Sequence, residues 1–384
     1  MAMMLRGAAR LVRRLRVFQT APAGSRGYCN PSVIPTGGAV PTIPGAYCES
    51  VQVVLGSNKD EATMGFETGR LARLTNGAVL ASLGDSRVMC AAVAAREPDG
   101  ADNFLPLTVD YRERASSHGK IPVAFNRREG APRDREVLAM RVLDRTVRPL
   151  FPKEYQTNTS IEVIVLATDG CQDPAVLAVN GASAALSISS IPWNGPVGAV
   201  RVSVVDGAIV LNPSDADIEA SEFTLFYAGN EHRTLMIEAA AMKPAGVPEA
   251  VVAAALTAAH EAVALLIPPQ HRLTAAMGKP KIVLPEPTPD VAALKSKILE
   301  VSGAKYLALY KEEIQSKSAR GKAMADLRKA TGEELAAQGL EFSQSDLDGA
   351  TLWAESRVMR DLIFDEGVRI DGRALRQVRQ LAAS

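Results

Sequence analysis

The sequence has few of the residues on which metal sites and disulfide frameworks depend. Its four cysteines and four histidines lie far apart, with no C-x-x-C pair and no H-E-x-x-H motif. This spacing predicts no zinc site and no disulfide framework, and it favours buried free thiols in a reducing compartment. The G-x-x-x-x-G-K-[ST] phosphate loop and the G-x-S-x-G elbow are also absent from the sequence.

Aromatic residues and long apolar runs are scarce as well. Aromatics make up 5% of the chain against 47% hydrophobic residues, so we expect a core of mostly aliphatic and small side chains. No run reaches the roughly 18 consecutive apolar residues that a membrane span needs, so the sequence predicts no such span. At 384 residues, the chain is long enough for two or three domains.

Acidic residues are missing from the N-terminus, where the first one is Glu49. Six arginines precede it, at positions 6, 10, 13, 14, 16 and 26, with leucines among them at roughly helical spacing. An acid-free, arginine-rich amphipathic start is typical of an organelle transit peptide, and the arginines favour a mitochondrial destination over a chloroplast one. We therefore interpret residues 1–28 as a mitochondrial transit peptide and residues 29–48, rich in Pro and Gly, as a lead-in.

The remaining charge excludes a globally basic nucleic-acid binder. The chain has 43 Lys+Arg and 43 Asp+Glu, so without those six arginines 37 basic residues face 43 acidic ones. A polyanion would have to be bound by a local cluster of positive charge. Residues 112–148 form such a cluster, with ten Lys+Arg and five acids.

Short β-rich runs follow the lead-in and alternate with helical patterns. We expect strands at 51–56 and 160–168 and hairpins over 77–95, 197–213 and 221–241, with turns at Gly84-Asp85-Ser86, Asp206-Gly207 and Gly229-Asn230. Helices are expected over 134–151, over 174–189 with Asp173 as N-cap, and over 248–267. Hairpins with interspersed helices predict an α/β (α+β) domain with a mixed sheet over residues 49–270.

The composition changes after residue 270. A Pro-rich connector at 279–290 leads into about 70 residues that are rich in Lys, Glu and Ala and have no strand pattern. We expect a connector and small all-helical domain over 271–363, with a last helix beginning near Ser345-Asp346. Residues 364–384 are too few to form a core of their own and are interpreted as the opening of a further domain.

Seven arginines lie between Phe125 and Phe151. At 100° per residue, Arg141, Arg145 and Arg148 fall on one side of the expected helix, opposite an apolar arc. They either form a solvated face that pairs with Glu136 and Asp144 or bind phosphates. Three nearby carboxylates could form one group but, without an anchoring motif, are interpreted as surface residues: Asp102, Asp110 and Glu113.

Three segments and one motif resemble the polynucleotide phosphorylase family. The segments are residues 67–93 (ETGRLARLTNGAVLASLGDSRVMCAAV), 104–152, which include FNRREG, and 173–202 (DPAVLAVNGASAALSISSIPWNGPVGAVRV). RIDGR at 369–373 is similar to the motif that opens an RNase PH-type domain. The resemblance covers nearly all of residues 50–384 in the expected order.

The resemblance implies a first RNase PH-like domain over 49–270, the helical domain, and a second RNase PH-like domain beginning at 364. It implies processive 3′-to-5′ phosphorolysis of RNA that uses inorganic phosphate and Mg²⁺ (or Mn²⁺). It also implies a homotrimeric ring around single-stranded RNA. The family's catalytic and metal-binding residues belong to the second RNase PH-like domain, so none is expected in this chain up to Ser384.

The same resemblance assigns RNA contacts in the first domain. It implies that Phe125 stacks on a base, that Arg127 and Arg128 bind the backbone, and that Arg145 and Arg148 support that surface or pair structurally. The sequence departs from the commoner pattern at Asn126, where a second Phe is usual, so the electrostatic contacts should dominate. The alternative function is a non-catalytic RNA-binding and ring-scaffold module.

Overall fold

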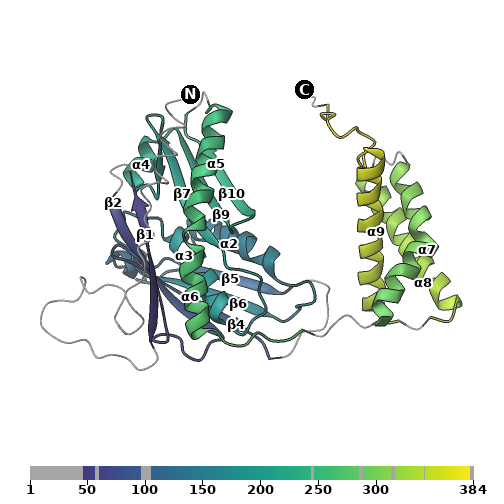
Figure 1. Cartoon of the computed structure of the whole chain (residues 1–384), viewed down its shortest axis with the longest axis horizontal. Helices are drawn as coiled ribbons and strands as arrows, with labels where there is room; N and C mark the ends of the chain where they lie inside the picture. Colours follow the sequence, from purple (N-terminus) through teal and green to yellow (C-terminus); the bar gives the residue numbers. More distant parts are fainter. Residues whose placement is uncertain are drawn as a thin grey trace, which may run out of the picture. The chain divides into compact units, whose positions relative to one another are not determined.

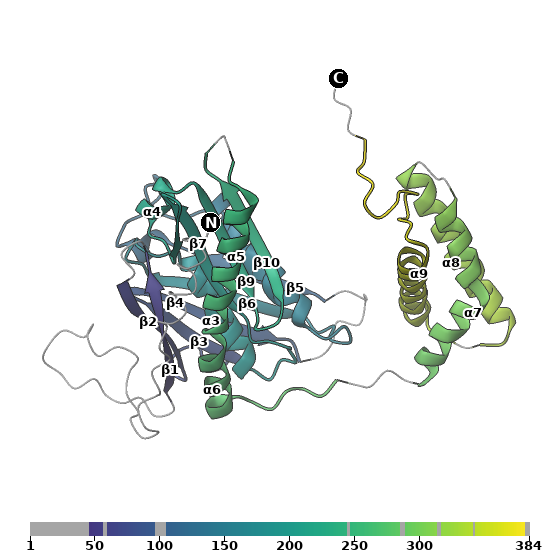
Figure 2. The ribbon, with the colours of Figure 1, turned by 45° about the horizontal axis from the view of Figure 1, so that its top comes forward.

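The computed structural model describes residues 46–56, 60–96, 105–243, 246–284, 289–312, 316–340 and 342–380. The predicted transit peptide and residues 29–45 of the lead-in lie outside these ranges. The chain divides into two compact units, the first ending at Leu284 and the second comprising the helices that follow. Figures 1 and 2 show the strands in the first unit and the long helices α7, α8 and α9 in the second.

The first unit is built on two sheets. Sheet A has six strands in the order β1-β2-β3-β4-β6-β5, in which only the β5–β6 pair is parallel, and sheet B has four antiparallel strands in the order β10-β9-β7-β8. The strands are β1 (Tyr47–Leu55), β2 (Asp60–Thr68), β3 (Gly77–Leu83), β4 (Ser86–Ala94), β5 (Leu107–Arg112), β6 (Thr159–Ala167), β7 (Gly198–Val205), β8 (Ala208–Leu211), β9 (Phe223–Gly229) and β10 (Thr234–Ala241). The predicted α/β fold with a mixed sheet is confirmed.

Helix α3 (Pro174–Ile188) forms the centre of this unit and is buried along nearly all its length. It packs against β3 and β4 of sheet A and β7 of sheet B. Small residues allow this close approach, because a Cβ added at Gly181 would lie 2.7 Å from Cys90 Sγ and 3.0 Å from Ala81 Cβ. The predicted N-cap is confirmed, since the Asp173 carboxylate accepts a hydrogen bond from Ala175 N at 3.0 Å.

The remaining helices of the first unit cover its edges. They are α2 (Asp134–Val147), α4 (Asp215–Ala220), α5 (Glu249–Ala264) and α6 (Ile267–Met277), with the 3-10 turns η2 (Ala115–His118) and η3 (Arg148–Leu150). Residues 249–277 are apolar and long enough to cross a membrane by length and composition alone. Here α5 packs on β7 and β9, and α6 packs on α3 and β1.

All three predicted hairpins are confirmed. At the second turn, Asp206 and Gly207 both have positive φ, 48° and 72°, as a type I′ turn requires. The sequence patterns did not predict β2, β5, α4 or α6, and β1 begins at Tyr47 within the predicted lead-in.

Two expected boundaries fall inside helices. The one between residues 270 and 271 lies within α6, because Gln270 is buried and hydrogen-bonded to Ser183 and to the carbonyl oxygen of Val197, so the first unit continues to Leu284. The one after residue 363 lies within α9, which ends at Glu366.

The second unit consists of α7 (Pro289–Lys311), α8 (Lys317–Ala337) and α9 (Gln344–Glu366). Its buried apolar residues include Leu294, Ile298, Leu335, Leu347 and Ala354. Helix α9 begins earlier than expected because Ser343, rather than Ser345, accepts the capping hydrogen bond from Asp346 N. The predicted helical region is confirmed.

The expectation of buried free thiols holds for only one of the described cysteines. Cys90 is a buried free thiol, and burial raises its pKa. Cys171 is free but exposed, because it lies in the turn after β6, and Cys48 is disulfide-bonded. The expectation is therefore wrong for Cys48 and Cys171.

Candidate functional site

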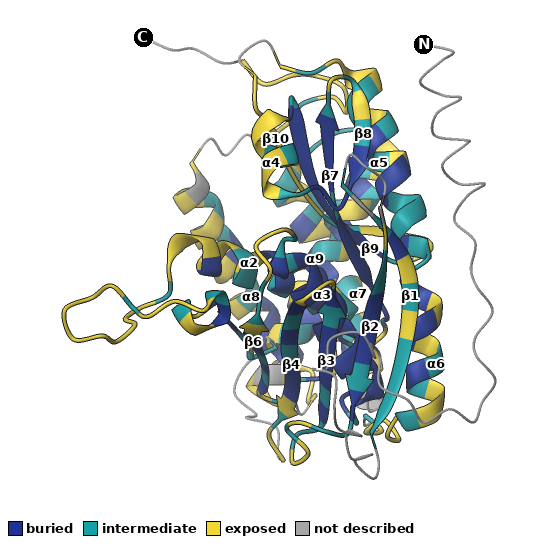
Figure 3. Cartoon of the chain, turned by 90° about the vertical axis from the view of Figure 1, so that its left-hand side faces the viewer, coloured by how far each residue is buried: buried dark blue, intermediate teal, exposed yellow. Residues whose placement is uncertain are grey.

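The candidate site is centred on the loop of residues 119–133, between η2 and α2. Figure 3 shows an exposed loop that projects from the unit beside α2. Residues 124–127 form a turn at the tip of this loop, in which Arg127 N donates to the Ala124 carbonyl oxygen at 2.8 Å. Phe125 lies in the turn and is 105% exposed.

The tip has a conformation that side chains rarely adopt. Arg127 has φ 54°, in the left-handed region that costs about 1–3 kcal/mol for a residue other than glycine. The Asn126 side chain accepts a hydrogen bond from Arg128 N at 3.1 Å, which gives this residue a local structural role. The turn therefore exposes Phe125, Arg127 and Arg128 together, as the predicted binding role requires.

The loop is fixed at its base by hydrogen bonds between charged side chains and the backbone. The Glu129 carboxylate accepts from Ala115 N, and the Arg133 guanidinium donates to the Glu113 carbonyl oxygen. The buried Glu136 carboxylate accepts from Arg133 N at 2.7 Å and from Glu113 N at 2.8 Å. The C-terminal part of the loop is thus joined to the segment that follows β5.

The electrostatics of Glu136 fit this anchoring role. Burial alone would raise the pKa of its carboxyl group, but the backbone N–H groups of Arg133 and Glu113, together with the Arg133 guanidinium, lower that pKa below its usual value. The charged carboxylate is therefore the form that holds the base of the loop.

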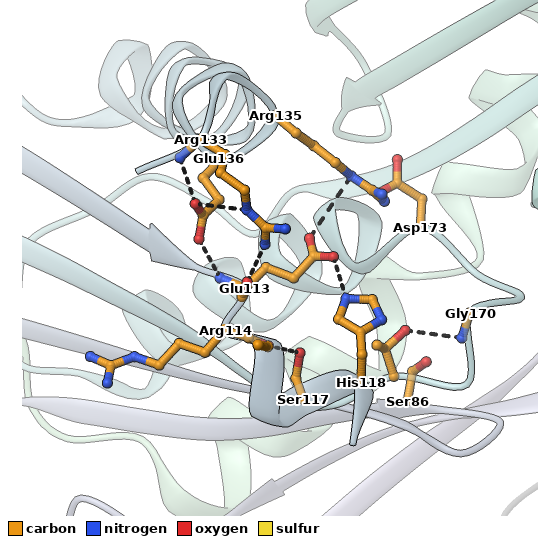
Figure 4. A network of polar contacts seen from close by, with 12 residues as sticks. Ser86, Glu113, Arg114, Ser117, His118, Arg133, Arg135, Glu136, Gly170 and Asp173 are labelled. Atoms are coloured by element: carbon orange, nitrogen blue, oxygen red, sulfur yellow. Dashed lines mark hydrogen bonds and ion pairs between the residues drawn. The ribbon is translucent and has the colours of Figure 1, made fainter. Parts of the chain in front are cut away.

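A second network lies directly beneath, around the carboxylate of Glu113 (Figure 4). This side chain is only 3% exposed, so its interpretation as a surface residue is wrong. One oxygen lies 2.8 Å from His118 Nε2, and the other accepts from the Tyr111 hydroxyl at 3.1 Å. Burial, followed by the nearby negative charges of Glu113 and Asp173, raises the pKa of Tyr111, which keeps this hydroxyl protonated as a donor.

Arg135 joins this network to the start of α3. Its guanidinium lies 3.8 Å from Glu113 and 3.6 Å from Asp173 (Figure 4). Asp173 also pairs with Arg201 at 2.5 Å. Asp173 also caps α3. Ionic contacts therefore link three parts of the unit, which are the segment after β5, helix α2 and the central helix α3.

The two predicted residues at the end of α2 have different surroundings. Arg148 pairs with Asp144 at 2.7 Å, and it donates to the carbonyl oxygens of Leu105 at 2.9 Å and Leu107 at 3.1 Å. Arg145 is exposed, and within the described parts of the chain no carboxylate pairs with it. Arg148 therefore holds the start of β5, whereas Arg145 is available on the surface.

The seven arginines of this segment thus divide into two groups. We define the anchored arginines as Arg133, Arg135 and Arg148, which contact carboxylates or carbonyl oxygens of the unit. We define the exposed arginines as Arg127, Arg128, Arg141 and Arg145, for which the described residues provide no ion-pair partner. Of the pairings expected from a solvated face, that of Arg148 with Asp144 is present, whereas Glu136 pairs with Arg133, which was not one of the expected partners.

Sequence reasoning missed two exposed apolar residues that lead to the tip, Ile121 and Val123, which are 68% and 101% exposed. Arg114 and Lys120, which belong to the predicted cluster at 112–148, are exposed beside them. The alternation of apolar residues in KIPVAF, next to a cluster of cations, was the available signal.

This arrangement suits a flexible polyanion that carries aromatic bases. Guanidinium groups without internal partners bind phosphate oxygens, and an exposed phenyl ring offers a stacking surface that accepts any base. Among the described residues, no group of three or more His, Cys, Asp or Glu side chains could hold a metal ion. The site as built can bind and orient, and we assign no metal-dependent step to it.

Comparison with protein families gives three matches along the chain. Residues 62–192 match domain 1 of the 3′ exoribonuclease family, and residues 195–262 match its domain 2. Residues 293–374 match the RNA-binding domain of polyribonucleotide nucleotidyltransferase. The first match contains the candidate site, and the third corresponds to the helical unit.

Curated relatives agree with these matches. "Polyribonucleotide nucleotidyltransferase 2, mitochondrial" of Oryza sativa subsp. japonica is 38% identical over 85% of this chain and 34% of its own length. The protein of the same name in Arabidopsis thaliana is 34% identical over 90% of this chain and 35% of its own length. The polyribonucleotide nucleotidyltransferase of Methylacidiphilum infernorum is 38% identical over 84% of this chain and 45% of its own length.

Proposed function

The chain belongs to the 3′ exoribonuclease family, in its polyribonucleotide nucleotidyltransferase branch, and from this premise we propose that it acts in the phosphorolytic degradation of RNA from the 3′ end. The chain spans between 34% and 45% of the length of the relatives named above. The reaction is accordingly proposed for the complete protein, and this chain is proposed to supply its RNA-guiding part.

In the proposed reaction, inorganic phosphate attacks the phosphorus of the terminal phosphodiester bond. The bond to the 3′ oxygen of the preceding nucleotide breaks, a nucleoside diphosphate leaves, and the RNA is one residue shorter. Such an in-line displacement depends mainly on positioning and on stabilisation of charge. We propose that the complete protein requires Mg²⁺ (or Mn²⁺) to neutralise charge on the transferred phosphoryl group.

The part proposed for this chain is carried by one observation: the tip exposes a phenyl ring and two guanidinium groups that nothing in the described unit neutralises. Phe125 stacks on a base, and Arg127 and Arg128 bind the phosphates on either side of it. Because stacking and phosphate contacts do not depend on base identity, the loop accepts any single-stranded sequence.

The two helical residues have separate parts in this proposal. Arg145 extends the positive surface along α2 toward the RNA backbone. Arg148 supports that surface, because its guanidinium is occupied by Asp144 and by two carbonyl oxygens. We also propose that the exposed Arg141 contributes to the same positive surface.

Location and assembly complete the proposal. The two plant relatives are named mitochondrial, and the arginine-rich, acid-free start of this chain is consistent with import into the mitochondrial matrix. We propose a homotrimeric ring for the complete protein, with the exposed loops of three copies facing single-stranded RNA.

The proposal that this chain binds and guides RNA, while the complete protein carries out the reaction, is tested with poly(A). The purified chain is incubated with poly(A), phosphate and Mg²⁺, and nucleoside diphosphate is measured against the same mixture without phosphate. The expected result is RNA that is bound but not shortened. Phosphate-dependent release would place the chemistry in this chain and contradict the proposed division, and an absence of RNA binding would contradict the guiding role.

A further inference from the structure

His118 is the residue that directly precedes the loop of residues 119–133. It ends η2, in which the Ser117 carbonyl oxygen accepts a hydrogen bond from Thr168 N, just after β6, at 3.0 Å. Gly119 follows with φ 67°, so the chain turns away from His118 as it enters the loop. A short, fixed segment therefore holds the imidazole at the start of the proposed RNA guide.

A contact with Glu113 determines which ring nitrogen carries the hydrogen. His118 Nε2 lies 2.8 Å from one oxygen of the Glu113 carboxylate (Figure 4). The other oxygen accepts from the Tyr111 hydroxyl, and Arg135 lies 3.8 Å from it. Because a carboxylate accepts hydrogen bonds and does not donate them, Nε2 carries the hydrogen, and Nδ1 of the neutral ring is an acceptor.

This acceptor is not used inside the protein. The described residues give Nδ1 no hydrogen-bond partner, and Nδ1 is not one of the buried polar atoms that lack a partner. The His118 side chain is 29% exposed. The contact with Glu113 thus leaves one ring nitrogen accessible, in a fixed orientation, to a ligand that donates a hydrogen bond.

Two exposed cations lie on either side of His118 in the sequence. Arg114 and Lys120 are both exposed, and neither has an ion-pair partner in the parts of the chain that the structure describes. Arg114 is the N-cap residue of η2, and Lys120 N donates to the Ala115 carbonyl oxygen at 2.9 Å, so η2 fixes both backbone positions. Such cations bind phosphates, and the group between two successive phosphates of a nucleic acid is the sugar.

We propose that His118 distinguishes RNA from DNA by accepting a hydrogen bond from a ribose 2′-hydroxyl group at Nδ1, an inference that rests on the proposed function. The contacts proposed for the tip do not sense the sugar, because Phe125 stacks on a base and Arg127 and Arg128 bind phosphates, which DNA also has. A phosphodiester has no hydrogen to donate to Nδ1. The 2′-hydroxyl group can donate one, and it is the group that DNA lacks.

Three oligonucleotides of equal length and the same base test this contact on the unaltered chain. Fluorescence anisotropy at pH 8 compares labelled oligo(A), oligo(dA) and 2′-O-methyl oligo(A). The 2′-O-methyl strand keeps the sugar conformation of RNA but has no hydrogen to donate at this position. Oligo(A) should bind about fivefold more tightly than either of the other two, as expected for one hydrogen bond.

His118→Gln removes the acceptor but keeps a donor for Glu113. The amide nitrogen of glutamine takes the place of Nε2, so the urea unfolding transition should stay unchanged. Affinity for oligo(A) should fall about fivefold, to that for oligo(dA), while affinity for oligo(dA) stays the same. His232→Gln is the matched control, because it replaces an exposed histidine between β9 and β10 and should keep the wild-type preference.

The outcomes separate this inference from the proposed function. Equal affinity of the unaltered chain for oligo(A) and 2′-O-methyl oligo(A) would overturn the role of His118, as would a full preference for RNA in His118→Gln. An equal loss of affinity for all three strands in His118→Gln would also overturn it, since His118 would then only support the loop. An absence of binding of any strand by the unaltered chain would overturn the proposed function as well.

Discussion

The two groups of arginines between Phe125 and Phe151 are close in sequence, but only one group has partners within the unit. The anchored arginines contact Glu113, Asp144, Asp173 and the carbonyl oxygens of Leu105 and Leu107. The exposed arginines contact no acid among the described residues. One group stabilises the base of the loop, and the other is left with its charge available for a ligand.

This difference teaches that charge density alone does not identify a binding residue. Arg145 and Arg148 are three residues apart in the same helical segment, yet only Arg148 reaches carbonyl oxygens some forty positions earlier in the chain. What separates them is the set of residues that the fold brings to each guanidinium. The two groups should therefore respond differently to substitution.

The largest effect on stability is expected from Arg148→Ala. The substitution leaves the carbonyl oxygens of Leu105 and Leu107 and the Asp144 carboxylate without their donor, which should lower the free energy of unfolding by about 2 kcal/mol. Urea denaturation measures this change. RNA affinity should stay within about twofold of wild type, because this guanidinium is already occupied.

Arg145→Ala is the matched substitution on the same helix. Because the side chain is exposed and has no described partner, its loss should change the free energy of unfolding by less than about 0.5 kcal/mol. RNA affinity should fall instead. Equal destabilisation by Arg145→Ala and Arg148→Ala would remove the distinction between the two groups.

The next largest effect is expected in the affinity for single-stranded RNA rather than in the free energy of unfolding. Phe125→Ala should weaken binding of single-stranded RNA about tenfold, because the ring no longer stacks on a base, while the unfolding transition stays unchanged. Fluorescence anisotropy with labelled oligo(A) measures the affinity. Leu74→Ala, at an equally exposed apolar residue in the loop between β2 and β3, is the control and should bind as wild type does.

A smaller effect is expected from Glu136→Gln, and it should depend on pH. The folded pKa of Glu136 lies below its usual value, so its stabilisation is present above the unfolded pKa and is lost as pH falls through the folded one. At pH 7 the substitution should cost about 1 kcal/mol, since it removes one hydrogen-bond acceptor. This difference should shrink as the solution is acidified below pH 4.

Urea denaturation between pH 7 and pH 3 measures how the loss of unfolding free energy caused by Glu136→Gln depends on pH. Glu61→Gln, on an exposed carboxylate of β2, is the control and should differ little from wild type at any pH. A cost for Glu136→Gln that stays constant over this range would show that the charge of the carboxylate does not anchor the loop.

Much of the fold follows from local sequence signals. The three hairpins and the capped helix α3 were predicted because turns and helix caps depend on residues that are adjacent in the sequence, such as Gly84, Asp206-Gly207 and Asp173-Pro174. Strand β5 was missed because its pairing is parallel to β6, fifty positions later, and no turn residue marks it. The end of α6 was missed because its buried Gln270 depends on contacts with Ser183.

The site was predictable only in its exposed half. The FNRREG segment identified Phe125, Arg127 and Arg128, which need no partner within the unit. The anchored half depends on contacts such as Arg135 with Asp173 and Arg133 with Glu113, which join positions that periodicity along one helix cannot relate. The burial of Glu113 beneath the loop was missed for the same reason.

The most direct test of the account is the salt dependence of RNA binding by Arg127→Ala/Arg128→Ala. The control is Arg73→Ala/Arg96→Ala. It removes two exposed arginines, one shortly before the start of β3 and one shortly after the end of β4. The log–log slope of affinity against salt should become shallower by roughly 0.7 for each phosphate group that the altered loop no longer binds, and the control should keep the wild-type slope. Equal slopes for the two double variants would contradict the assignment of this loop as the RNA guide.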